Sequence, residues 1–143
     1  MVASPFSLRE IGETDRDDVV RLVQESRVSA GKFRGGDVLW EHIDQIDLST
    51  LPGRLAVAND QACGVVLWSC ALDALTVEIL FVEESARGIG IGESLVNATV
   101  EQARAQGCRR VAGRALPGDR ETKNVYERTG LVSQVITVGR NLD

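Results

Sequence analysis

Apolar and polar residues follow two different spacings along this chain. Alternation of apolar and polar positions is typical of a half-buried strand, and recurrence every three to four residues is typical of a helix with one buried face. Residues 74–82 (ALTVEILFV) are apolar almost throughout, which indicates a strand buried on both faces of a sheet. The spacings predict strands at residues 6–11, 54–59, 62–71, 74–82, 108–116 and 131–140, and helices at residues 14–27, 37–46, 93–106 and 119–130.

Turn signals indicate how these elements connect. Asn59, Asp60 and Gln61 separate the second and third strands by a short hairpin turn, and Leu72-Asp73 separates the third from the fourth. Strands joined by short turns run antiparallel, whereas the two later strand–helix–strand units require crossovers. The predicted fold class is α/β (α+β): a single domain over residues 1–143 with a mixed, mostly antiparallel sheet and helices on both faces, in the order β-α-α-β-β-β-α-β-α-β.

Composition narrows the possible functions. The net charge is −5 and the pI about 4.9, and no Lys/Arg run is longer than Arg109-Arg110, so we expect no nucleic-acid partner. No apolar run approaches the roughly 20 residues that span a bilayer. The N-terminus has no apolar signal segment, so we expect a soluble, cytoplasmic protein with no membrane partner. One histidine, His42, and three irregularly spaced cysteines fit no common metal site, so we expect no metal.

A glycine-rich stretch, ARGIGIGES at residues 86–94, follows the buried strand and precedes a helix. It is not a P-loop, because it has no lysine, and not a dinucleotide fingerprint, because Glu93 or Leu95 stands where the third glycine belongs. The first turn of a helix has unpaired N–H donors, and glycines let an anion approach them closely. The stretch is therefore a diphosphate site or a turn that merely joins strand to helix. The candidate anion-binding residues are Arg87, Gly88, Ile89, Gly90, Ile91, Gly92 and Glu93.

Two motifs in the second half of the chain resemble those of the GNAT superfamily of N-acetyltransferases. The pyrophosphate loop of that family reads [RQ]-x-x-G-x-[GA], which Arg87, Gly90 and Gly92 match. A later family helix often reads N-x-x-A-x-x-x-Y-E-x-x-G-F. The matching residues are Tyr126, Glu127 and Gly130, and the departures are Asp119 for Asn, Thr122 for Ala and Leu131 for the aromatic residue. The predicted element order is also that of the family.

The resemblance implies a GNAT-like fold and acetyl-CoA as co-substrate, with direct transfer of the acetyl group to an amine of a small molecule or peptide. In the family, the backbone at Leu80, Phe81 and Val82 pairs with the pantetheine arm, and positions 119 and 126 lie near it. Tyr126 is then the general acid that protonates the leaving thiolate, with a core tyrosine as the alternative. Asp119 also suits the N-cap of its helix. Family members often dimerise through terminal strands, so the resemblance also implies a homodimer that forms through residues 132–138.

Glu78 is the one charged residue within the apolar strand 74–82. A buried carboxylate is costly unless it is hydrogen-bonded or opens into a cleft, and burial raises its pKa toward that of a useful base. Glu78 is therefore the candidate base that takes the proton of the acceptor amine. The alternative is a glutamate paired with an arginine or exposed. Arg114 could line the acceptor cleft, and the loop with Lys32, Phe33 and Arg34 lies where family members build the acceptor wall.

Two further functions stay open at this point. A non-catalytic acyl-CoA-binding sensor or regulatory domain would use the same loop without the proton chemistry of Tyr126. A phosphate-binding α/β domain that does not bind CoA would need the loop alone.

Overall fold

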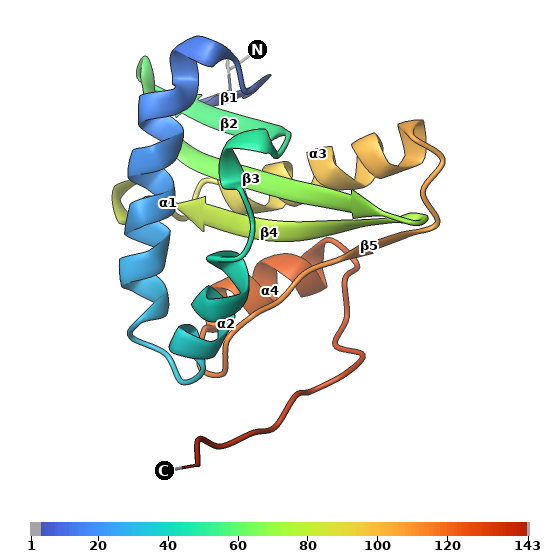
Figure 1. The fold of residues 1–143 in the computed structure, drawn as a ribbon. Coiled ribbons are helices and arrows are strands. Elements are labelled where there is room, and N and C mark those ends of the chain that lie inside the picture. Colours follow the sequence, from blue (N-terminus) through green and yellow to red (C-terminus); the bar gives the residue numbers. More distant parts are fainter. Residues whose placement is uncertain (1–3, 143) are drawn as a thin grey trace.

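A twisted five-stranded sheet with helices on both faces forms the fold, which a computed structural model describes for residues 4–142 (Figure 1). The strands are β1 (Ser7–Glu10), β2 (Gly53–Ala58), β3 (Gln61–Ala71), β4 (Ala74–Val82) and β5 (Arg110–Ala112), and the sheet order is β1-β2-β3-β4-β5. The helices are α1 (Arg16–Ala30), α2 (Gly36–Ile43), α3 (Ile91–Ala105) and α4 (Arg120–Arg128). Short 3₁₀ turns occupy η1 (Glu13–Asp15), η2 (Leu48–Thr50) and η3 (Glu84–Ala86).

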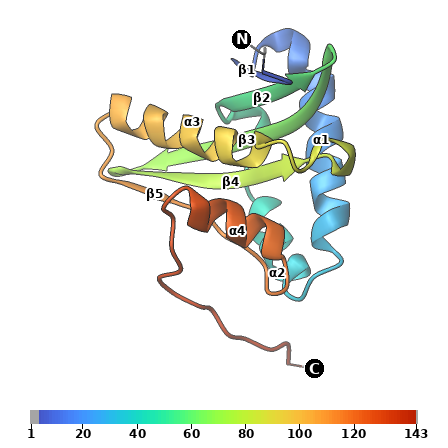
Figure 2. The same cartoon turned by 180° about the vertical axis from the view of Figure 1, so that it is seen from behind.

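The two faces of the sheet bury separate apolar clusters, as the alternation in β3 predicts. Val66 and Trp68 pack toward α3 and α4, whereas Val65 and Leu67 pack toward α1 and α2. Figures 1 and 2 show the two helix pairs from opposite sides of the sheet. The predicted fold class, with helices on both faces, is confirmed.

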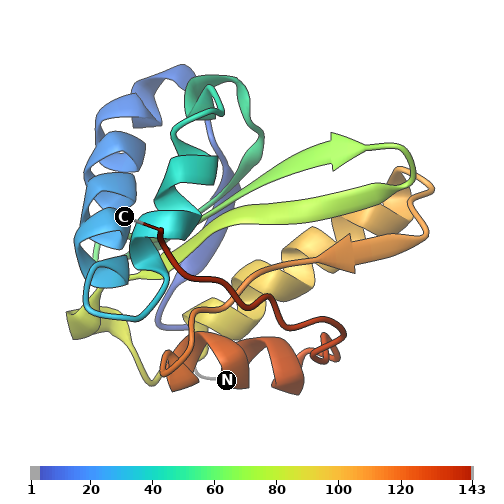
Figure 3. The ribbon, with the colours of Figure 1, turned by 60° about the horizontal axis from the view of Figure 1, so that its bottom comes forward.

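The sheet opens between its last two strands. All pairs from β1 to β4 are antiparallel, but β4 and β5 run parallel and pair only at Ala74–Thr76 with Arg110–Ala112. Beyond this point the two strands diverge, as Figure 3 shows from below. The edge of β4 from Val77 to Val82 therefore faces no strand on the β5 side among the described residues.

A β-bulge interrupts β4 at Glu78. Leu67 of β3 faces Ile79 and Trp68 faces Val77, so no residue of β3 faces Glu78. An extra residue in one strand reverses the alternation of side chains beyond it. Val77 accordingly packs with the α3–α4 cluster and Ile79 with the α1–α2 cluster. The bulge thereby decides to which side the carboxylate of Glu78 points.

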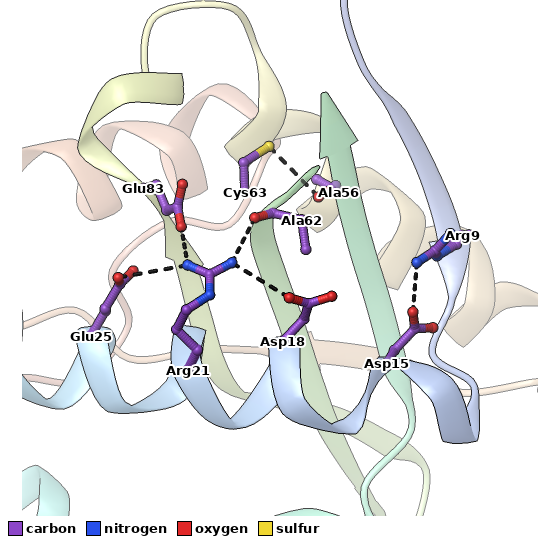
Figure 4. Close-up of polar contacts among 9 residues, drawn as sticks. All are labelled: Arg9, Asp15, Asp18, Arg21, Glu25, Ala56, Ala62, Cys63 and Glu83. Carbon is purple, nitrogen blue, oxygen red and sulfur yellow. Dashed lines mark hydrogen bonds and ion pairs between the residues drawn. The ribbon is translucent and has the colours of Figure 1, made fainter. Parts of the chain in front are cut away.

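Most predicted boundaries agree with the structure within a few residues. The hairpin turn between β2 and β3 is confirmed, with Asn59 and Asp60 at φ of 53° and 63°. Helix α1 continues beyond Arg27 to Ala30, where the chain passes close to α2: a Cβ on Gly36 would lie 2.1 Å from the Ala30 carbonyl oxygen. Buried Asp15 joins the start of α1 to β1 by accepting hydrogen bonds from Gly12 N at 2.9 Å and Arg9 at 2.5 Å (Figure 4).

The predicted strand at residues 131–140 is wrong. Residues 131–142 form no regular structure, and Figure 1 shows them leaving α4 outside the sheet. Val135 and Ile136 are 86% and 82% exposed. A strand needs a hydrogen-bonding partner, and β5, which the prediction placed over residues 108–116, is only three residues long. A favourable pattern alone therefore does not make this segment a strand.

Candidate active site

A cleft of about 630 Å³ lies where β4 and β5 diverge. One end is lined by α1, α2 and the loop between them, and the other by the glycine-rich loop, the start of α3 and the first turns of α4. β4 forms the wall between these ends, and all residues from Val77 to Val82 line the cleft. The lack of pairing between β4 and β5 thus creates a channel with one free strand edge.

The three glycines of the loop have different structural roles. Gly88 and Gly90 adopt φ of +86° and +89°, a region that residues with a Cβ rarely adopt, and no other group comes within 4 Å of where their Cβ atoms would be. Gly90 is also the N-cap of α3. Gly92 instead allows α3 and α4 to approach, because its Cβ would stand 3.1 Å from a methyl group of Val125. Only the first two therefore leave open space for a ligand.

The start of α3 supplies the donors that an anion needs. Within the helix the first hydrogen bond runs from Ser94 N to the Gly90 carbonyl, so the preceding N–H groups have no helical acceptor. Arg87 donates from Nε to the Val82 carbonyl at 3.1 Å and pairs with Glu121 at 3.1 Å. Backbone donors, a fixed guanidinium and two glycines with open space at their Cβ positions together can hold a diphosphate.

Tyr126 of α4 lines the cleft and is 7% exposed. Burial raises the pKa of its phenol far above the usual value, against a smaller lowering by Arg114, so the hydroxyl keeps its proton at neutral pH. The ring lies against the backbone just beyond β5, because a Cβ on Gly113 would stand 2.6 Å from its Oη and Cζ atoms. Gly113 therefore makes room for the phenol.

Glu78 belongs to the β4 wall of the cleft and lies next to α2, with its side chain only 6% exposed. Its carboxylate accepts hydrogen bonds from Ser69 Oγ at 2.7 Å and from Arg114, and His42 Nε2 lies 3.4 Å away. Burial alone would raise the pKa of Glu78, but Ser69, Arg114 and His42 outweigh it and the pKa lies below the usual value. The expected rise in this pKa is wrong. The alternative of a glutamate paired with an arginine describes the contacts seen here.

Asp119 is the N-cap of α4. Its carboxylate accepts hydrogen bonds from Thr122 N at 3.2 Å and from Thr122 Oγ1 at 2.8 Å. Asp119 also lines the cleft, and it lies on the same face of α4 as Tyr126. The structural role predicted for Asp119 is confirmed, and contact with a ligand stays a prediction.

Comparisons with known proteins identify the family of this chain. The profile of the Acetyltransferase (GNAT) family matches residues 21–131, more than half of the chain. The chain belongs to this family. The resemblance drawn from the two motifs is confirmed, and this GNAT protein is an acetyl-CoA-dependent N-acetyltransferase with acetyl-CoA as its co-substrate. A search of curated protein sequences found no match.

Solved structures share the same fold. Aminoglycoside N-acetyltransferase AAC(6')-Iy, solved in complex with CoA, superposes with a TM-score of 0.70 at 21% identity, over 99% of this chain and 98% of that one. Ribosomal-protein-alanine N-acetyltransferase from Brucella melitensis biovar Abortus 2308 gives 0.67 at 15% identity, over 96% and 98%. A predicted acetyltransferase from Clostridium acetobutylicum, solved with acetyl-CoA, gives 0.67 at 15% identity, over 95% and 96%. At these identities the likeness extends to the GNAT fold, not to the acceptor.

The cleft of this acetyltransferase brings together most residues predicted to bind acetyl-CoA. They are Leu80, Phe81, Val82, Arg87, Gly88, Gly90, Ile91, Gly92, Glu93, Asp119 and Tyr126. Ile89 is not among the lining residues and is 45% exposed. The carboxylate of Glu93 pairs with Arg128 at 2.8 Å, a hydrogen bond that holds the pKa of Glu93 below its usual value. Glu93 therefore lines the cleft together with Arg128, which compensates its negative charge.

The acceptor end was predicted in part. Arg114 and Phe33 line the cleft, whereas Lys32 and Arg34 are not among its lining residues. Sequence reasoning missed Gly113, Ser69 and His42. No local signal identifies them, because each acts through a neighbour on another element. Within residues 4–142, no cluster of three or more metal-ligating side chains occurs, and no helix has the length and apolar character to cross a membrane.

Proposed function

We propose that residues 1–143 work as one cytoplasmic acetyltransferase domain whose acceptor is a monoamine with an apolar body. The observation that carries this proposal is the lining of the α1–α2 end of the cleft. The apolar side chains there are Phe33, Leu39, Trp40, Ile43 and Leu116. Among the lining residues of this end, only Glu78 and Arg114 are charged, and they are bonded to each other.

This lining argues against a polycationic acceptor. Each ammonium group that leaves water needs an anionic or hydrogen-bonding partner, and an unpaired one is costly. The carboxylate of Glu78 can serve one ammonium, and Arg114 already neutralises part of its charge. Apolar side chains instead favour an alkyl or aryl group next to the reacting nitrogen.

Two side chains then carry the two proton transfers of the reaction, one from the amine and one to the sulfur. Acetyl-CoA supplies the acetyl group on a thioester, the amine nitrogen bonds to the acetyl carbon, and the carbon–sulfur bond breaks. Glu78, charged at neutral pH because of its lowered pKa, accepts the proton from the amine, directly or through water. Tyr126 donates its phenolic proton to the sulfur that leaves. The backbone at Leu80, Phe81 and Val82 holds the pantetheine arm along the free edge of β4.

An acceptor panel tests the proposed substrate class. The purified chain is incubated with acetyl-CoA and each acceptor, and release of the CoA thiol is followed. We expect kcat/KM for 2-phenylethylamine to exceed that for kanamycin by at least about tenfold, because pocket contacts of this size discriminate by that order. 2-Phenylethanol, which lacks the nitrogen, is the control. Faster reaction with kanamycin would contradict the substrate class, and CoA binding without thiol release from any amine would identify the non-catalytic sensor instead.

Glu78→Gln tests the base. Because the pKa of Glu78 lies below its usual value, the wild-type side chain stays charged from pH 6 to 9, and its own titration adds no limb to the profile in that range. We expect the variant to lower kcat/KM by about tenfold to a hundredfold at every pH in this window, without a change in the shape of the profile. Glu41→Gln, which removes an exposed charge from α2, is the matched control. Superimposable profiles for Glu78→Gln and wild type would remove Glu78 from the mechanism.

We propose a homodimer in addition, through residues 131–142. The segment carries five exposed apolar side chains, Val132, Val135, Ile136, Val138 and Leu142. Burying them against a second copy would remove apolar surface from water and give the segment a neighbouring strand, which it does not have among the described residues 4–142. Sedimentation equilibrium of the full chain distinguishes a dimer from a monomer.

A further inference from the structure

Arg21 of α1 lies at a polar junction beside the start of β3 and the end of β4 (Figure 4). Its guanidinium donates to the carboxylate of Glu83 and, at 2.9 Å, to the carbonyl of Ala62 at the start of β3. Two acidic residues of the same helix complete its surroundings, Glu25 at 3.6 Å and Asp18 at 3.8 Å. One side chain thus connects α1, β3 and the end of β4.

Glu83 is the point at which β4 becomes the glycine-rich loop. Its N–H donates to the Cys63 carbonyl at 2.8 Å, which continues the β3–β4 ladder by one step. Its own carbonyl accepts from Ala86 N at 3.0 Å and so closes the first turn of the loop. The side chain of Glu83 is 24% exposed, less than the 41% of Arg21. Glu83 is therefore both the last residue that the sheet binds through its backbone and the residue whose side chain Arg21 binds.

The tip of the loop, from Gly88 to Gly90, has few contacts, whereas Arg87 before it is bonded to the Val82 carbonyl and to Glu121. At Gly88 and Gly90, no group lies within 4 Å of the position that a Cβ atom would take, and Ile89 is largely exposed. The backbone N–H groups of Ala86 and Arg87 donate back to the carbonyls of Glu83 and Glu84. The position of this tip therefore depends on the residues that flank it. These are the segment from Glu83 to Arg87, which begins at the Arg21–Glu83 junction, and the buried side chain of Ile91 at the start of α3.

We propose that Arg21 is a positioning residue for acetyl-CoA, acting through Glu83. It fixes the first end of the loop in the geometry that meets the diphosphate, so that less ordering is needed when the cofactor binds. It also neutralises the carboxylate of Glu83, which directly follows the cleft-lining residue Val82, and so lowers the repulsion of an anionic ligand in the cleft. Both effects concern binding of the CoA moiety and leave the acetyl-transfer step unchanged.

Calorimetric titration with CoA, together with steady-state kinetics, tests this role. We expect Arg21→Met to raise the Kd for CoA and the KM for acetyl-CoA by about fivefold to tenfold, with kcat within about twofold of wild type, since only pre-organisation and charge pairing are lost. Arg27→Met is the matched control. Arg27 also lies on α1 and pairs with Asp44 at 2.8 and 3.0 Å, but it has no contact with the loop, so the CoA Kd should stay within about twofold.

A double variant separates action through Glu83 from a general loosening of the fold. Arg21→Met leaves the Glu83 carboxylate without its partner, so adding Glu83→Gln should restore part of the lost CoA affinity. Two outcomes would overturn the proposal: an unchanged Kd in Arg21→Met, or losses in the two single variants that simply multiply in the double variant. Because CoA binding is measured without an acceptor, neither outcome depends on the proposed acceptor or on turnover.

Discussion

Tyr126→Phe is expected to lower kcat by at least about tenfold while the KM for acetyl-CoA changes little. The substitution keeps the ring that fills the space beside Gly113 and removes only the hydroxyl. Burial raises the pKa of this phenol, so the group holds a proton at neutral pH and can give it to the departing sulfur. Turnover is measured with a saturating acceptor, and thermal unfolding checks that the core is intact. Unchanged turnover would refute the role of Tyr126 as the acid.

Gly113→Ala approaches the same site without changing the tyrosine. The new methyl group would stand 2.6 Å from Oη and Cζ, closer than real contacts allow, and the buried ring has to shift. We expect kcat to fall by about the same order as in Tyr126→Phe, because proton transfer depends on placement of the donor. Gly139→Ala is the control, since a Cβ there meets nothing within 4 Å. Wild-type turnover in Gly113→Ala would show that the position of the phenol does not limit the reaction.

Gly90→Val is expected to raise the KM for acetyl-CoA by about tenfold or more, and to alter acceptor preference far less. Gly90 has φ of +89° at the N-cap of α3, where a β-branched residue is strained and places methyl groups over the anion site. The KM values for both substrates are measured in the same series. The loop would be misassigned if the KM for acetyl-CoA stayed constant while the acceptor KM rose.

Gly107→Val is the matched control for that experiment. Gly107 also has a positive φ, +74°, with open space around its Cβ position, but it lies at the other end of α3 and outside the cleft lining. Both variants therefore carry backbone strain, of the order of 1–3 kcal/mol. Only Gly90→Val should combine this strain with a large change in the KM for acetyl-CoA.

Local patterns predicted most of the sheet and the site loop. The run from residue 54 to residue 82 was predicted within a residue or two, because alternation and short turns are properties of neighbouring residues. The spacing of Arg87, Gly90 and Gly92 and the later Tyr126 were sufficient to predict the family. The segment 131–140 has the same alternation but no strand beside it, and pairing is a property of the tertiary structure.

The charge state of Glu78 shows where sequence reasoning stops. The apolar run around it predicts burial correctly, but burial was only one of the influences on its pKa. Ser69 is nine residues away in sequence, and His42 and Arg114 are each 36 residues away. The β-bulge that turns Glu78 toward them depends on the register of β3 against β4.

The sequence by itself determined the order of the elements as far as α4 and the family, and it singled out the candidate anion-binding loop and the candidate acid, because each depends on residues close together in the chain. Tertiary structure alone decided three further features: the fit of Gly113 to Tyr126, the ionisation of Glu78, and the link between Arg21 and Glu83, 62 residues apart. Each of these features depends on which side chains the folded sheet and helices bring into contact. The spacing of residues along the chain does not determine those contacts.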